Sequence, residues 1–203
     1  MDQLSVEVSR DPPKPSVTVW TSSHGSSNRY LRNFTKNFFN RQSRFQSPWF
    51  DSVPGRKMTP DLVTDILNDI RQRAPHPQLH LLMMGDNNLR HSKEDPREVS
   101  RMLMDIVNEA RNYQRAYVIV STLMPSIENI NKNNQIFLDF DKELKQNLNP
   151  RVEVLDLGKS LRTKQGAIKE HLFEDQVHLN QTGAYVVAEQ IYDKVMHTPK
   201  NFL

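Results

Sequence analysis

The chain of 203 residues contains no cysteine. This absence excludes disulfide bonds, a thiolate nucleophile and zinc sites built on cysteine. The seven histidines are scattered and lack the short spacings typical of metal ligands, and no glycine-rich phosphate-binding loop is present. The sequence therefore predicts no metal centre and no cofactor.

Long hydrophobic runs are also missing, so we expect no membrane span. The first fourteen residues are polar and charged, unlike a secretory signal peptide. A hydrophobic fraction of 36% is low, yet it is sufficient for the core of one α/β domain of this length. We expect a flexible lead-in over residues 1–15, a single domain over 16–203, and a cytoplasmic protein without a membrane partner.

Short apolar runs alternate with amphipathic segments along the chain. The runs are nearly continuous, which is typical of strands buried on both faces of a parallel sheet. This order predicts an α/β protein, a three-layer αβα sandwich with a parallel, flavodoxin-like sheet. The strands are expected at 16–21, 79–84, 116–121 and 152–156. Four of the helices are expected after the Thr59-Pro60 and Asp95-Pro96 signals, over 132–147, and after a Thr182 cap.

Positive charge is concentrated in two segments. Residues 22–57 hold seven lysines and arginines but a single acid, Asp51, and residues 159–169 hold four cations and no acid. Residues 59–158 between them are net acidic. Because both basic segments follow predicted strands, we expect them at the same end of the sheet, where they would attract a polyanion. The candidate nucleic-acid-binding residues are Arg29, Arg32, Lys36, Arg41, Arg44, Arg162, Lys164 and Lys169.

A solvated helix face is the alternative interpretation of the first basic segment. Aromatic residues are threaded through it, and most of them have an ordinary explanation. We expect Phe34 and Phe38 to form the buried face of a helix, and Trp49 and Phe50 to pack in a loop. Tyr30 and Phe45 remain as candidates for base stacking.

Polar motifs follow the predicted strands, where parallel sheets place their working crevice. They are Thr21-Ser22-Ser23-His24-Gly25, Gly85-Asp86-Asn87-Asn88, and Asp175 to Asn180 with its Asp-x-x-His spacing. In this order the motifs resemble those of the SGNH (GDSL-type) hydrolases. The resemblance runs from about residue 16 to 197. It implies a serine nucleophile at Ser23, an oxyanion-stabilising Asn87, an orienting acid at Asp175 and a base at His178.

The chain departs from that family pattern at several positions. Thr21-Ser22-Ser23 stands where the family has Gly-Asp-Ser, and Asn88 stands where the family usually has aspartate. The glycine that supplies a second oxyanion amide has no clear counterpart, with Gly55 as the remaining candidate. The triad is therefore predicted to have an altered supporting shell, and catalysis tolerates loose geometry poorly.

Three further segments resemble the SGNH-like domain of insect germ-plasm organisers: residues 20–27, 47–51 and 199–203. This resemblance implies a non-catalytic domain that binds messenger RNA, including its 3′ untranslated regions, and takes part with other proteins in germ-granule assembly. The competing hypotheses are an active esterase or deacetylase that uses Ser23, Asn87, Asp175 and His178, and a protein-interaction scaffold.

Overall fold

The computed structural model describes residues 14–22, 29–42, 44–74, 76–110, 112–113, 116–128, 130–147 and 153–199. Nearly all of the predicted lead-in lies outside these residues. No helix within the described ranges is long and apolar enough to cross a membrane.

Five parallel strands form one sheet in the order β2-β1-β3-β4-β5, the flavodoxin-like order. The four predicted strands are confirmed to within one residue at each end. The fifth strand, β2, was not predicted: Trp49 and Phe50, which were expected to pack in a loop, begin this edge strand. The sequence does not reveal β2, since Phe50 is its only fully buried residue. The strands are β1 (Ser16–Thr21), β2 (Trp49–Ser52), β3 (Gln78–Met83), β4 (Ala116–Ser121) and β5 (Glu153–Leu155).

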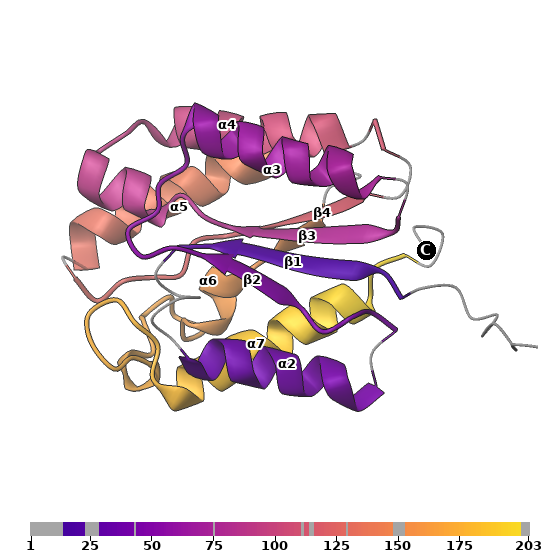
Figure 1. Ribbon diagram of the computed structural model, residues 1–203. Helices are drawn as coiled ribbons and strands as arrows, with labels where there is room; N and C mark the ends of the chain where they lie inside the picture. Colours follow the sequence, from indigo (N-terminus) through magenta and orange to yellow (C-terminus); the bar gives the residue numbers. More distant parts are fainter. Residues whose placement is uncertain are drawn as a thin grey trace, which may run out of the picture.

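Helices cover both faces of the sheet and complete the predicted three-layer sandwich (Figure 1). One face carries α2 (Arg29–Gln42), α6 (Leu157–Ser160) and α7 (Gln181–Met196). The other carries α3 (Pro60–Arg73), α4 (Pro96–Ala110) and α5 (Ile130–Asn147). Two short helices, η1 (Asn88–Ser92) and η2 (Glu170–Leu172), follow β3 and precede α7. Each helical layer packs on its own apolar cluster, so the sheet lies between two cores.

The helix starts agree with the sequence in one case and correct it in another. Thr59 caps α3 as predicted, because its hydroxyl accepts a hydrogen bond from the Leu62 N–H at 3.2 Å. The cap of α7 is Asn180, not Thr182. The Asn180 backbone is extended, and its Oδ1 accepts the Gly183 N–H at 3.0 Å, which places Thr182 inside the first turn.

Helix α2 buries a different face from the one predicted. Leu31, Thr35 and Phe39 are fully buried against the sheet, whereas Phe34 and Phe38 are only partly buried. The reason is that α2 packs on its neighbour α7 as well as on the sheet. Phe34 and Phe38 lie along that helix–helix seam.

A buried histidine in β3 should make the fold sensitive to acid. The Trp20 Nε1–H donates to His80 Nδ1 at 3.1 Å, and His80 Nε2 donates to Gln78 at 2.7 Å, so the neutral ring has a partner at each nitrogen. Burial, together with nearby Arg73, lowers the pKa of His80 from 6.5 to about 3.

Because the unfolded chain binds this proton near pH 6.5, we expect stability to fall as the pH drops from 6.5 towards 3, by up to about 1.4 kcal/mol for each pH unit. Denaturant unfolding at pH 7 and pH 5 measures the loss. A His80 ring that titrated near pH 6.5 in the folded protein would contradict the expectation.

Candidate functional site

The strand ends bring two of the predicted motifs together. Thr21 ends β1 beside Met83 at the end of β3. The buried Ser22 hydroxyl donates to Asp86 Oδ1 at 3.0 Å, which ties the first motif to the second. Ser23, the predicted nucleophile position, lies outside the described residues, as do His24 and Gly25.

Asp175 and His178 form the pair that their spacing predicts. His178 Nδ1 lies 2.7 Å from Asp175 Oδ2, and the Val177 and His178 backbone N–H groups donate to Asp175 Oδ1 at 2.7 and 2.6 Å. Partial desolvation acts to raise the pKa of Asp175, but these three hydrogen bonds outweigh it and lower the pKa to about 2. The carboxylate therefore stays ionised and orients the ring. Both side chains are partly solvent-exposed.

Asn87, the predicted oxyanion residue, is already engaged within the protein. Its Nδ2 donates to the Arg56 carbonyl at 3.0 Å, its Oδ1 accepts from Arg90 at 3.0 Å, and the residue is 2% exposed. An oxyanion hole needs a donor directed at the substrate oxygen. Gly55, the remaining candidate for the second oxyanion amide, is exposed in a turn at φ +69°.

The asparagine at position 88 has a structural role that aspartate could not fill. Asn88 Oδ1 accepts the Met58 N–H at 2.7 Å, while its Nδ2 donates to the Met58 carbonyl and to Glu94, both at 2.8 Å. The side chain is completely buried and needs both a donor and an acceptor. It fixes the segment before α3 against η1.

We expect Asn88→Asp to destabilise the fold by about 2–4 kcal/mol, because a carboxylate cannot donate to Met58 and would be buried beside Glu94. Urea unfolding measures this change. The exposed Asn37→Asp is the control and should change stability little. Equal unfolding midpoints for wild type and Asn88→Asp would contradict the assigned role.

Arg90 is a site residue that the sequence did not reveal. Its guanidinium is nearly buried and reaches Asn87 at 3.0 Å, Asp86 at 4.0 Å and Glu128 at 3.9 Å. It places a permanent positive charge beside the crevice at the end of β3. The only sequence signal is its position three residues after Asn87 in a helical segment.

Helix α2 displays part of the first basic segment on its outer side. Arg29 and Arg41 are exposed and Lys36 is partly exposed. Arg29 lies over the Tyr30 ring, with 5.1 Å from its guanidinium carbon to the ring centre. Among the described residues, no carboxylate forms an ion pair with Lys36 or Arg41.

Two of the predicted RNA contacts have structural roles in the same region. Arg32 donates to Ser52 at 3.1 Å and lies over the Phe50 ring, which ties α2 to β2. Arg44 donates to the carbonyls of Met196 and Thr198 at the end of α7. Phe45 is 2% exposed, so it has no face for a base.

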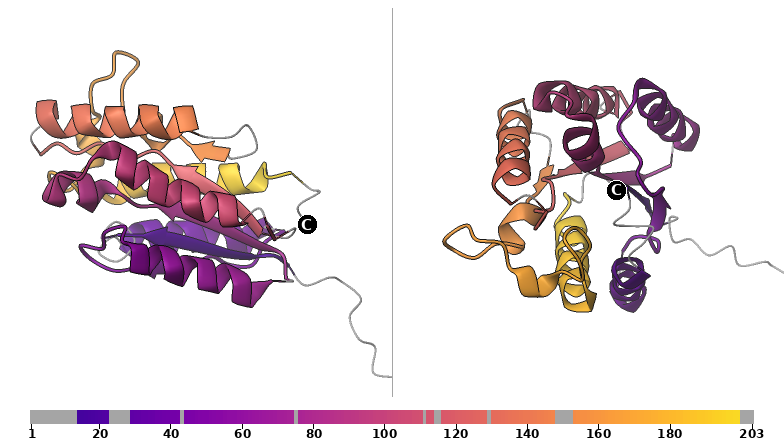
Figure 2. Two further views of the ribbon diagram at one scale, coloured as in Figure 1. Left: turned by 90° about the horizontal axis from the view of Figure 1, so that it is seen from above. Right: turned by 90° about the vertical axis from the view of Figure 1, so that its left-hand side faces the viewer.

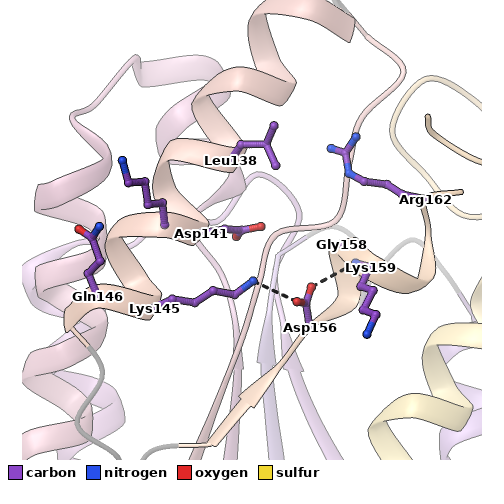
Figure 3. Close-up of a pocket in the computed structure, with 9 residues that line it drawn as sticks. Leu138, Asp141, Lys145, Gln146, Asp156, Gly158, Lys159 and Arg162 are labelled. Carbon is purple, nitrogen blue, oxygen red and sulfur yellow. Dashed lines mark hydrogen bonds and ion pairs between the residues drawn. The ribbon is translucent and has the colours of Figure 1, made fainter. Parts of the chain in front are cut away.

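Lys159 and Arg162 of the second basic segment help to line a groove of about 500 Å³ between α5 and the residues that follow β5 (Figure 3). Asp141 reaches into it from α5 and Arg162 from the opposite wall, and Lys145 pairs with Asp156 at 3.0 Å. Lys169 donates to the Ser160 carbonyl at 2.9 Å, and Lys164 is exposed. The groove is lined by Leu138, Asp141, Lys142, Lys145, Gln146, Asp156, Gly158, Lys159 and Arg162.

Asp141, which reaches into this groove, should make the stability of the fold depend on pH. Burial raises the pKa of Asp141 from 3.8 to about 7, against the opposing effects of the Leu123 N–H, Lys145 and Arg162, and with a smaller contribution from Asp156. The native carboxyl keeps its proton where the unfolded chain loses it, so its stabilisation is lost as the pH rises from about 4 to 7.

We expect Asp141→Asn to be more stable than wild type at pH 8 by about 1–2 kcal/mol, a value reduced for partial solvation. At pH 5 the two proteins should be nearly equal. The asparagine oxygen can still accept the Leu123 N–H, which makes the substitution conservative. Thermal unfolding at both pH values tests this, and a pH-independent difference would contradict it.

Both basic segments begin at the carboxyl ends of strands, as expected, but they do not adjoin. Helix α2 carries the first segment back to the opposite end of the sheet, where the Gln46 N–H donates to the Pro15 carbonyl at the start of β1. The two segments follow β1 and β5, which are three strand positions apart, roughly 14 Å. Viewed onto the carboxyl ends of the strands, α7 lies between α2 and the segment after β5 (Figure 2, right). A polyanion would have to cross the start of α7 to reach both.

No family model matches the chain. Among curated proteins, the platelet-activating factor acetylhydrolase IB subunit beta homolog of Drosophila melanogaster is 27% identical over 121 residues, which cover 58% of this chain and 52% of that protein. The matched region thus spans about half the length of the relative.

The solved structures give a more complete match. A lipolytic protein of the G-D-S-L family from Veillonella parvula has a TM-score of 0.68 at 16% identity, covering 88% of this chain and 96% of that one. A carbohydrate esterase of family 3 from Talaromyces cellulolyticus has a TM-score of 0.62 at 17% identity, covering 89% and 96%. The chain therefore shares the α/β fold of these G-D-S-L-type and esterase structures.

Proposed function

We propose that this domain is a non-catalytic member of the SGNH-like fold that binds single-stranded RNA through its basic surface. The observation that carries the proposal is the outer side of α2, where Lys36 and Arg41 have no carboxylate partner among the described residues. Such cations release the counterions condensed on a phosphate backbone and so drive binding. An ordinary solvated helix mixes both signs of charge, and α2 contains no acidic residue.

The state of the crevice favours the non-catalytic alternative. Asn87 is buried and bonded to Arg90 and to the Arg56 backbone, so it would have to rearrange before it could stabilise an oxyanion. Catalysis depends on donors that are already in place. The hydrolase geometry would then serve as the frame that presents basic side chains.

The biological setting follows from a resemblance in sequence. Three segments are similar in sequence to the C-terminal domain of Oskar, the insect germ-plasm organiser: residues 20–27, 47–51 and 199–203. By that resemblance, the ligand would be messenger RNA, including 3′ untranslated regions. The protein would act in cytoplasmic germ granules together with other granule proteins.

Titration of a fluorescently labelled, unstructured RNA with the full chain at several salt concentrations tests the proposal. We expect affinity to fall steeply with salt, with a logarithmic slope of about −0.7 for each phosphate contacted. Absence of binding at 50 mM salt would overturn the proposal.

An esterase remains the second candidate, and the Asp175–His178 contact of 2.7 Å is what favours it. In that case Ser23 would be the nucleophile and His178 its base. A serine-reactive phosphonate probe and an acetyl-ester assay separate the two functions. Labelling of Ser23 that disappears in His178→Ala would establish the hydrolase, whereas the RNA-binding proposal predicts no labelling.

A further inference from the structure

A small pocket opens on the seam between α2 and α7, away from the crevice at the strand ends. Its volume is about 130 Å³, enough for one nucleobase ring, and it is lined by Phe34, Asn37, Phe38, Arg41 and Tyr185. Tyr185 is 43% exposed, so part of its ring is accessible to a ligand. The pocket therefore combines aromatic faces with an amide and a cation.

The rings around the pocket form a continuous, braced array. Tyr185 lies 5.4 Å from both Phe34 and Phe38, measured between ring centres, and meets Phe34 edge-on. Phe38 in turn stacks on Tyr192 at 5.6 Å. Contacts of this kind hold the Tyr185 ring in place although one side of it faces solvent. A ligand that stacks on such a ring loses little entropy to ordering it.

The polar side chains at the rim select the kind of ligand. Arg41 and Asn37 are exposed on α2, and Arg41 has no carboxylate partner among the described residues. Asn37 can both donate and accept hydrogen bonds, as the edge of a nucleobase requires. A purely apolar partner would leave Arg41 and Asn37 unused. A stacked base with its phosphate would use the Tyr185 ring, Asn37 and Arg41 together.

We propose that this pocket binds one unpaired nucleobase of single-stranded RNA, which stacks on Tyr185 while Arg41 contacts its phosphate. The inference rests on the proposed RNA-binding function and makes it more specific, because it selects unpaired over paired RNA. A base within a duplex is already stacked on its neighbours and cannot enter. Stacking accepts any base, so sequence preference should be modest.

The test uses an unstructured RNA that carries one 2-aminopurine, whose fluorescence is quenched on stacking. Tyr185→Leu removes the ring but keeps an apolar side chain, and we expect about tenfold or greater loss of affinity together with loss of quenching. Tyr185→Phe keeps the ring and should behave like wild type. Trp49→Leu removes an even more exposed ring outside the pocket and serves as the matched control.

Salt dependence separates stacking from charge. Tyr185→Leu should leave the slope of affinity against salt unchanged, whereas Arg41→Gln should reduce it by about 0.7. Affinity for a double-stranded RNA should not change in Tyr185→Leu. Thermal unfolding of each variant confirms that the fold is intact.

The outcomes distinguish this inference from the function on which it rests. If Tyr185→Leu kept wild-type affinity and quenching while charge variants lost RNA, the stacking site would be wrong and RNA binding would stand. The stacking site would also be wrong, and RNA binding would stand, if Tyr185→Leu lowered the affinity for paired and unpaired RNA equally. If wild type bound no RNA at low salt, both proposals would fall.

Discussion

The double substitution Lys36→Glu/Arg41→Glu is expected to lower the affinity for single-stranded RNA by about 30-fold or more at 0.1 M salt. Two phosphate contacts are lost and two repulsive charges are introduced at the same positions on α2. The slope of affinity against salt should become shallower by about 1.4, since each contact with single-stranded RNA contributes about 0.7. Both side chains lie on the outer side of the helix, so the fold should persist.

A charge-matched control distinguishes a localised site from a general effect of net charge. Arg97 and Arg101 are exposed on α4, on the opposite face of the sheet, and their reversal to glutamate changes the net charge by the same amount. We expect the Arg97→Glu/Arg101→Glu variant to retain most of the affinity. Equal losses in the two double variants would argue against a site on α2. Fluorescence anisotropy with one labelled RNA measures both.

Gly183→Ala is expected to destabilise the domain by more than about 3 kcal/mol or to prevent folding. Helix propensity alone predicts the opposite, because alanine exceeds glycine by about 1 kcal/mol within a helix. The packing around Gly183 decides whether the substitution stabilises or destabilises the fold. A Cβ at Gly183 would lie 2.1 Å from the Leu172 carbonyl oxygen and 3.1 Å from its carbon. Both are backbone atoms, which cannot move aside as a flexible side chain would.

The Gly183 contact also bears on the site. Leu172 accepts the Asn180 N–H at 3.0 Å, and the chain between them carries Asp175 and His178. Relief of the clash would shift that segment. Gly158→Ala is the matched control, because its nearest contact would be an ordinary 3.5 Å to the Leu123 carbonyl oxygen. Chemical denaturation compares the two variants, and similar stabilities would contradict the packing argument.

Local signals in the sequence were sufficient for much of the fold. Four strands could be predicted because strands buried on both faces are nearly continuous apolar runs. The start of α3 was readable because Thr59 and Pro60 act within one turn. Strand β2 could not be predicted, because an edge strand with one fully buried residue shows no hydrophobic pattern in the sequence. The cap of α7 was misplaced because Asn180 and Thr182 are both competent caps, and only the backbone conformation distinguishes them.

In the candidate site, too, features set by local spacing could be predicted and features set by distant partners could not. The Asp175–His178 pair follows from a spacing of three residues, which backbone geometry alone brings together. The state of Asn87 does not follow from any local pattern, because it depends on Arg90 and on the Arg56 carbonyl from a distant loop. The roles of Arg32 and Arg44 are likewise decided by partners 20 and more than 150 residues away.

By itself, the amino-acid order determined the αβα architecture, the polar motifs at the strand ends and the unequal distribution of charge, since each depends on neighbours along the chain. Only the tertiary structure decided which cations remain available to a ligand and where an aromatic ring faces solvent. Pairing and exposure depend on what packs nearby, and α7 reaches α2 from the far end of the sequence. The Tyr185 pocket exists because two helices meet there, and neither helix contains it alone.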